Sequence, residues 1–136
     1  RAIIAAKARG AKRGVMLPVS APFHSSLMKP AADRLAAELA RLDITPPSIP
    51  VLHNADVADH SSPEAIRAAL AMQAASPVRW SDTMRAFVAR GVTHVVECGP
   101  GKILTGLTRR IDENVAGFAL NDRAAIDDAL AALRAG

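Results

Sequence analysis

The sequence has little cysteine, few aromatic residues and no long apolar run, and each shortage excludes something. The single cysteine, Cys98, excludes an internal disulfide and fits a reducing cytoplasm, where we expect the protein to work. Aromatic residues make up only 3% of the 136 residues, too few for the stacking platforms of a single-stranded nucleic-acid site. No apolar run approaches the roughly 18 residues of a transmembrane helix, so we expect no membrane span.

Aliphatic residues and positive charge are what the sequence does contain. Hydrophobic residues make up 50% of the chain, which is typical of a globular protein. The net charge is +4, spread over the chain, which favours a solvated surface over the alternative of a docking face for an acidic partner. The opening, RAIIAAKARG, has neither an initiator methionine nor a signal-peptide pattern, so we expect a fragment of a longer protein.

Hydrophobic periodicity predicts an alternation of helices and strands. The predicted helices cover residues 2–9, 26–42, 61–75, 81–91, 102–111 and 123–134. The predicted strands cover residues 15–20, 49–54, 92–98 and 115–120. Such an alternation indicates an α/β fold with a largely parallel sheet.

Serines are the expected caps of three helices. Ser25 or Ser26 is predicted to cap the helix over 26–42, and Ser81 the one over 81–91. For the helix between them, Ser61 in a capping box and Ser62 before a proline fit equally well. One face of the first of these helices carries Leu27, Ala31, Leu35, Leu39 and Leu42, which predicts the side that packs.

The stretch CGPGKILTG resembles a phosphate-binding loop but departs from both known patterns. The Walker pattern fails because Ile103 follows Lys102 and Val96 stands where its first glycine should be. The dinucleotide pattern fails because Leu104 replaces the third glycine. A packing turn between a strand and a helix is the preferred interpretation, and an anion site at the helix N-terminus stays the alternative.

The four histidines have no spacing typical of a metal site. His94 lies within a predicted strand and His60 in a polar loop, whereas His53 ends a strand, a common place for active sites in α/β sheets. His24 differs, because Pro22 and Phe23 stiffen the loop that holds it between a strand and a helix. A general base needs such fixed placement, so His24 is the candidate that we weigh further.

A nucleophilic serine for His24 is not apparent in the sequence. Ser20, Ser25 and Ser26 are close in sequence, but neighbouring residues rarely present their side chains to one another in the required geometry. The sequence contains no Gly-x-Ser-x-Gly elbow. If His24 is a base, its nucleophile lies outside these 136 residues.

Several motifs in register resemble one family. The stretches LPVSAPFHSSLMKPAADRLAAEL, QAASPVRW, ECGPGKILTGLTRRI and FALND together look like the C-terminal portion of malonyl-CoA:acyl carrier protein transacylases. The resemblance covers nearly the whole chain. It implies a large α/β-hydrolase-like acyltransferase subdomain, with 21–136 as its C-terminal part, and a small ferredoxin-like subdomain, with 1–20 as a remnant.

The resemblance also implies a chemistry. Such enzymes move malonyl from coenzyme A to the phosphopantetheine thiol of acyl carrier protein in fatty acid biosynthesis, through an acylated serine and a histidine that serves as base and then acid. His24 matches that histidine, and Gln73 matches the residue whose backbone carbonyl orients its ring. Phe23 resembles the residue that precedes the histidine in many malonyl-selective domains. No cofactor is implied beyond the coenzyme A thioester as substrate, and no metal, nucleic acid or membrane partner is expected.

The same resemblance implies what this chain lacks. The family's nucleophilic serine, its carboxylate-binding arginine and its oxyanion-hole glutamine match no residue here, so we expect the isolated chain to be inactive and to pair with the missing N-terminal part. An acyltransferase domain cut from a polyketide synthase is an alternative within the family. A nucleotide- or anion-binding module that uses Gly99–Gly101 is an alternative outside it.

Overall fold

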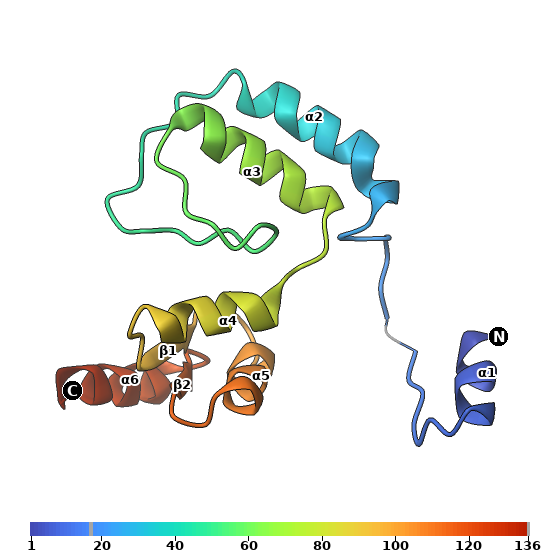
Figure 1. The fold of residues 1–136 in the computed structure, drawn as a ribbon. Coiled ribbons are helices and arrows are strands. Elements are labelled where there is room, and N and C mark those ends of the chain that lie inside the picture. The colour runs from blue at the N-terminus through green and yellow to red at the C-terminus, as the bar shows by residue number, and fades with distance from the viewer. Residues whose placement is uncertain (17, 136) are drawn as a thin grey trace.

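The computed structural model describes residues 1–16 and 18–135, which form several helices and one small parallel sheet (Figure 1). The elements in chain order are α1 (Ala2–Ala8), the 3₁₀ helix η1 (Ser26–Met28), α2 (Lys29–Leu39), α3 (Pro63–Ala75), α4 (Trp80–Ala89), β1 (His94–Glu97), α5 (Ile103–Ile111), β2 (Ala116–Ala119) and α6 (Arg123–Ala135). The α/β class predicted from the sequence is confirmed. Among the described residues, no helix is both long and apolar enough to cross a membrane.

The sheet is the core of a β1–α5–β2 unit. β1 and β2 pair in parallel, with His94 opposite Ala116 and Glu97 opposite Ala119. Parallel strands need a crossover connection, and α5 supplies it by packing on both strands. The helix comes close at Gly117, where an added Cβ would lie 3.0 Å from Thr105 Cγ2. Only glycine lets strand and helix approach this closely without a shift.

The core beneath α5 is centred on Met84 and Thr108. Both side chains are fully buried, Met84 from α4 and Thr108 from α5. Thr108 Oγ1 donates to the carbonyl of Leu104 at 2.9 Å, and it lies 3.8 Å from Met84 Sδ. The hydroxyl of Thr108 is therefore satisfied inside its own helix, which removes the cost of burying it.

Helices α2 and α3 form a separate pair. They lie side by side (Figure 1), and Ala32, Leu39, Ile66 and Ala69 are buried between or beside them. Arg67 of α3 donates to the carbonyls of Leu39 and Leu42 at 3.0 and 2.7 Å. These carbonyls lie at the C-terminal end of α2, where a cation is favoured, so Arg67 fastens the two helices at that end.

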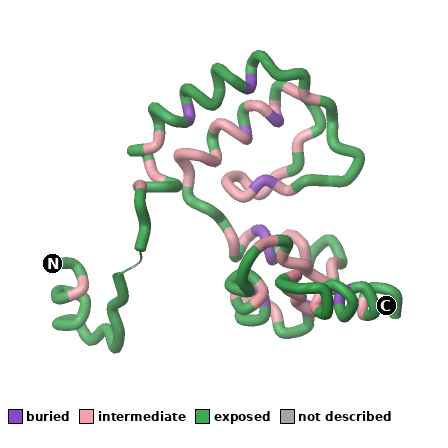
Figure 2. Tube along the Cα trace, turned by 180° about the vertical axis from the view of Figure 1, so that it is seen from behind, coloured by how far each residue is buried: buried purple, intermediate pink, exposed green. Residues whose placement is uncertain are grey.

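Helix α1 is confirmed in its expected place, but it has no buried residue. It stands apart from the other elements (Figure 1), and most of the described residues between it and η1 are exposed (Figure 2). Gly10 follows the helix with φ +91°, a left-handed conformation that suits glycine and ends the helix as expected.

Two strand predictions are wrong. Residues 15, 16 and 18–20 form no strand and are exposed; Leu17 lies outside the described residues. Over 49–54 only an isolated antiparallel bridge between Leu52 and Asp59 forms. A strand exists only where a neighbour supplies hydrogen-bond partners, and among the described residues neither segment has a neighbour that pairs with it beyond that one bridge. The sheet is parallel as predicted, but within residues 1–16 and 18–135 it contains only β1 and β2.

The helix predicted over 26–42 is shorter than expected, and the predicted cap by Ser25 or Ser26 is wrong. It begins as η1 and ends as α2 at Leu39, and the N-cap positions at Ser25 and Met28 have no side-chain cap. Its packed side is carried by Ala32 and Leu39, while Leu27, Leu35 and Leu42 of the predicted face are exposed. Apolar periodicity marks what a helix can bury, but only the neighbours present decide what it does bury.

Of the other predicted caps, one alternative is confirmed and one prediction is wrong. Ser62 Oγ accepts the N–H of Ala65 at 3.2 Å, which settles the cap of α3 in favour of Ser62. Helix α4 begins earlier than predicted, with Arg79 at its N-cap, so Ser81 lies inside its first turn and caps nothing.

The buried centre at Met84 leads to a stability prediction. Met84→Ala in the full-length protein should lower the free energy of unfolding by about 2–5 kcal/mol, because it leaves a cavity against α5. Urea unfolding followed by circular dichroism measures the change. The matched control on the same helix is Ser81→Ala, which should stay within about 0.5 kcal/mol because this exposed serine is not the cap. Equal losses in both variants would contradict the packing described for α4.

Candidate active site

His24 lies on the exposed loop before η1, in a backbone conformation that few residues adopt. Its φ is +57°, in the left-handed region. For a residue with a Cβ, this conformation costs roughly 1–2 kcal/mol compared with the right-handed one. Non-glycine residues keep such a conformation when their surroundings hold it, and this occurs often at functional sites.

The ring of His24 is held by a contact across the fold. His24 Nδ1 lies 3.2 Å from the backbone carbonyl oxygen of Gln73, 49 residues further along the chain. A carbonyl oxygen only accepts, so in this hydrogen bond Nδ1 carries the proton. The neutral ring then has its lone pair on Nε2, which is the nitrogen able to take a proton from a substrate or a nucleophile.

The Gln73 carbonyl is available because α3 ends there. In a continuing helix, this oxygen would accept the N–H of the residue four positions later, but that residue is Pro77, which has no N–H. Ser76 is extended, and its N–H reaches the Gln73 carbonyl only at 3.5 Å. The carbonyl also lies at the negative end of the helix, which favours a hydrogen-bond donor there. The Gln73-to-Pro77 spacing therefore leaves an acceptor open for His24.

The serines near His24 are not arranged as nucleophiles. Ser25 Oγ donates to the carbonyl of Pro22 at 2.7 Å, so its proton is committed to the loop itself. Ser20 and Ser26 are exposed. Among the described residues, the His24 ring is hydrogen-bonded to the Gln73 carbonyl and to no serine hydroxyl.

The other histidines lie in polar contacts of their own. His53 is buried, with its ring centroid 5.2 Å from that of His60. His60 Nε2 lies 2.8 Å from Asp56 Oδ2. Partial burial raises the pKa of Asp56, but its hydrogen bonds with His60 and the Ala58 N–H outweigh that effect and lower the pKa overall. His94 Nδ1 lies 2.8 Å from Thr93 Oγ1 on the sheet.

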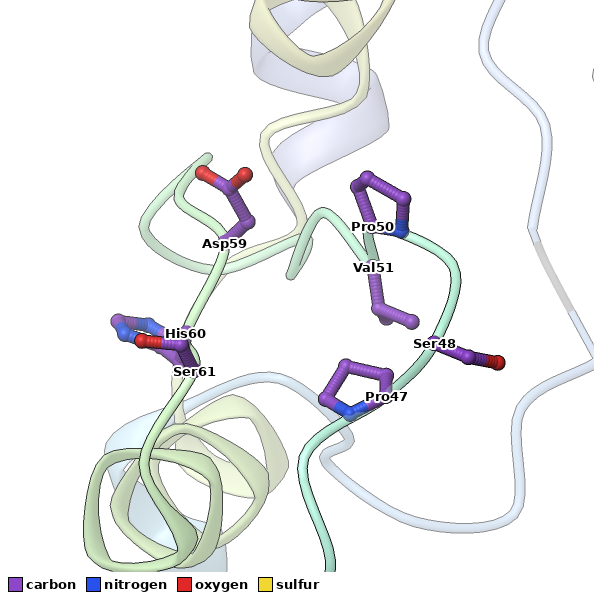
Figure 3. Close-up of a pocket in the computed structure, with 7 residues that line it drawn as sticks. All are labelled: Pro47, Ser48, Pro50, Val51, Asp59, His60 and Ser61. Carbon is purple, nitrogen blue, oxygen red and sulfur yellow. The ribbon is translucent and has the colours of Figure 1, made fainter.

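A cavity of about 360 Å³ lies beside His60 of this second histidine group (Figure 3), and His24 is not among the residues that line it. Pro47, Pro50 and Val51 line one side, and Asp59, His60 and Ser61 line the other. Asp59 is paired with Arg90 at 3.2 Å. Over residues 1–16 and 18–135, no three histidine, cysteine, aspartate or glutamate side chains group in a way that could hold a metal ion.

The glycine turn after β1 is closed by side chains of the chain itself. The carboxylate of Glu97 accepts the N–H of Leu104 at 3.2 Å and the N–H and hydroxyl of Thr105, each at 2.8 Å. Gly101, with φ +98°, donates its N–H to Asn121 Oδ1 at 3.0 Å. Glu97 thus occupies the N-terminal end of α5, the place that a bound phosphate would take. This arrangement supports the packing-turn interpretation of CGPGKILTG.

Sequence reasoning did not assign roles to Glu97 and Asn121. Glu97 ends a strand and accepts a hydrogen bond from an amide seven residues later. Asn121 lies across the turn from Gly101. No local spacing pattern reveals such contacts. A carboxylate at a strand end before a glycine turn and a helix is the signal that could have suggested the first of them.

Comparisons with known proteins agree on one class. No family model matches the chain. A solved acyl-carrier-protein S-malonyltransferase from Burkholderia pseudomallei is 55% identical, with a TM-score of 0.89 over 96% of this chain and 42% of that one. A malonyl-transacylase solved in complex with a type II PKS acyl-carrier protein is 46% identical, with a TM-score of 0.90 over the same shares. The fold is therefore that of part of an acyl-carrier-protein malonyltransferase.

The curated relatives make the class more specific. Malonyl CoA-acyl carrier protein transacylase from Salmonella typhimurium is 50% identical over 130 residues, and the Bacillus subtilis protein of that name is 39% identical over 129. Nearly the whole length of this chain is homologous to part of these relatives, which confirms the resemblance found in the motifs. It spans 42% of the length of the Salmonella relative and 41% of the Bacillus one, as the expected fragment would.

The closed turn leads to a prediction about pH. Hydrogen bonds from Thr105 and Leu104 outweigh the effect of burial and hold the pKa of Glu97 below its ordinary value of 4.5. The stabilisation is therefore complete above pH 4.5 and is lost as the pH falls through the folded-state pKa. In the full-length protein, Glu97→Gln should be less stable than wild type at neutral pH, and the gap should narrow in acid.

Urea unfolding at pH 7 and at several values below 4.5 measures this gap. The control is Glu113→Gln, an exposed glutamate between α5 and β2, which should match wild type at every pH. A Glu97→Gln gap that stays constant or widens in acid would show that the carboxylate does not cap α5 in the way described.

Proposed function

We propose that this chain supplies the general base of an acyltransferase that moves malonyl from malonyl-CoA to the phosphopantetheine thiol of acyl carrier protein. The contact between His24 Nδ1 and the Gln73 carbonyl carries the proposal, because it leaves Nε2 as the basic nitrogen. The relatives named malonyl CoA-acyl carrier protein transacylase supply the reaction. Phe23, exposed beside His24, is a further candidate for acyl-group selectivity.

The histidine acts twice in the proposed reaction. His24 Nε2 takes the proton from a serine hydroxyl while the serine oxygen attacks the malonyl thioester carbonyl. The proton then passes to the departing coenzyme A thiolate, which leaves malonyl on the serine. In the second half, His24 takes the proton of the carrier thiol, this sulfur attacks the ester, and the proton returns to the serine oxygen. A backbone carbonyl in place of a carboxylate orients the ring without adding a negative charge.

The nucleophilic serine, the arginine for the malonyl carboxylate and the oxyanion-hole glutamine are proposed to lie in the rest of the protein. The support is that the 136 residues contain no Gly-x-Ser-x-Gly elbow and span 42% of a curated relative. Large apolar side chains exposed here, among them Ile4, Met16, Leu27 and Ile103, fit a surface that the remaining part covers. The isolated chain is accordingly proposed to be inactive.

The finer division of the fold belongs to the same proposal. Residues 1–20 are assigned to the end of a small ferredoxin-like subdomain, and 21–136 to the C-terminal part of a large α/β-hydrolase-like subdomain. The separation of α1 from the other elements supports this division (Figure 1). A cytoplasmic location is part of the proposal and fits the free, exposed thiol of Cys98.

An acyltransferase of polyketide synthesis is the second candidate function. One observation favours it: a relative of known structure was solved with a type II PKS acyl-carrier protein. Transfer rates of the full-length protein to a fatty-acid carrier and to a polyketide carrier would separate the two. An anion-binding module that uses Gly99–Gly101 has less support, because Glu97 takes up the amides of α5.

Substitution of the proposed base tests the mechanism. In the full-length protein, His24→Ala should lower kcat for malonyl transfer by roughly three or more powers of ten, because base and nucleophile act as a unit. The measurement is transfer of radiolabelled malonyl from malonyl-CoA to acyl carrier protein. The matched control is His60→Gln, which keeps a donor toward Asp56 and should leave the rate within about twofold, because this half-buried histidine lies outside the proposed site. Comparable losses in both variants would argue against His24 as the base.

The isolated chain provides an independent test. Incubated with radiolabelled malonyl-CoA, the 136-residue chain should remain unlabelled, whereas the full-length protein should carry one malonyl ester on a serine. Mass spectrometry of peptide digests locates the label. A malonyl ester on any residue of the isolated chain would contradict the proposed division of the site.

A further inference from the structure

The hydroxyl of Ser25 bridges the backbone on the two sides of His24. Ser25 Oγ donates to the Pro22 carbonyl at 2.7 Å, an ordinary distance for a well-formed O–H···O hydrogen bond. The bond closes a loop of four residues with His24 inside it. His24, whose ring contacts the Gln73 carbonyl, has φ +57° in this loop.

This bond is not a helix cap. Ser25 precedes η1 in an extended conformation, with φ −134° and ψ 165°, and its side chain makes no cap hydrogen bond. The hydroxyl turns back toward Pro22, while the Ser25 carbonyl accepts the N–H of Met28 at 2.9 Å. Ser25 therefore ties the His24 loop on one side to the first turn of the following helix on the other.

The left-handed conformation of His24 needs such a tie. If the backbone relaxed to negative φ, the Cβ and the ring would point in another direction, and Nδ1 would leave the Gln73 carbonyl. The Phe23 N–H donates to the Ala21 carbonyl at 2.9 Å, but this hydrogen bond lies entirely before His24 in the chain. The bond from Ser25 is the one that spans His24 itself.

We propose that Ser25 is a positioning residue, whose hydroxyl bond to Pro22 holds His24 in the left-handed conformation that lets Nδ1 reach the Gln73 carbonyl. The effect of Ser25 on catalysis rests on the function proposed above, because it requires that His24 is the base. The effect of Ser25 on the conformation of His24 does not depend on that function, since the tautomer of the His24 ring reports the Gln73 contact directly.

The test compares Ser25→Ala, Ser25→Cys and Ser25→Thr in the full-length protein. Loss of one hydrogen bond of ordinary strength changes a conformational equilibrium by roughly threefold to tenfold. Ser25→Ala should therefore lower kcat for malonyl transfer by about that factor, with KM for malonyl-CoA within about twofold, because a smaller fraction of the enzyme is competent. Ser25→Thr keeps the hydroxyl and should restore kcat. Ser26→Ala, at the exposed next position, is the control and should behave as wild type.

Ring nitrogen-15 shifts of His24 supply the readout that does not depend on activity. Wild type and Ser25→Thr should show the neutral ring with its proton on Nδ1, and Ser25→Ala should show an increased share of the other tautomer. Ser25→Cys, with its weakly donating thiol, should fall between them. The same tautomer in all four proteins, or a loss that Ser25→Thr does not reverse, would overturn the proposal. If wild type transfers no malonyl but its tautomer still follows Ser25, the function is wrong and the positioning role stands.

Discussion

The hydrogen bond between His24 and the Gln73 carbonyl joins the two features on which the candidate site depends. One is a loop in which His24 has a positive φ, and the other is a helix whose last turn leaves the Gln73 carbonyl with only a long bond from the Ser76 N–H. Pro77 removes the donor that would otherwise take this acceptor, so the end of α3 serves the ring. A neutral oxygen here fixes which ring nitrogen carries the proton, and it adds no second titrating group to the site.

The packing of α2 on α3 keeps the two halves of this contact together. Arg67 fastens the far end of the pair by binding the carbonyl of the last residue of α2 and that of Leu42 just beyond it. Small buried residues such as Ala32 and Ala69 allow the helices to lie close. His24 stands just before η1 and α2, while Gln73 stands in the last turn of α3. A change in the angle between the helices would therefore move the ring and its acceptor apart, which makes helix packing part of the site.

The β1–α5–β2 unit shows why a glycine-rich turn need not bind a phosphate. Its helix N-terminus has the amide donors of an anion site, but Glu97 supplies the anion from the preceding strand. Gly101 serves the turn through its positive φ, and Gly117 serves close packing through its missing Cβ. The failed Walker and dinucleotide spacings were therefore an informative signal, because the positions that would face a ligand are used inside the fold.

The sequence alone determined the helices with strong periodicity, the β-branched strand at β1, the Ser62 cap and the motifs that identify the family, since all of these depend on neighbours within a few residues. Only the tertiary structure decided that residues 15, 16, 18–20 and 49–54 form no strand here, because a strand needs a partner that a sequence pattern cannot supply. It also decided the left-handed backbone of His24, the turn of the Ser25 hydroxyl toward Pro22 and the carboxylate of Glu97 on α5. Each of these is set by where the backbone directs a polar group in space, which no residue spacing encodes.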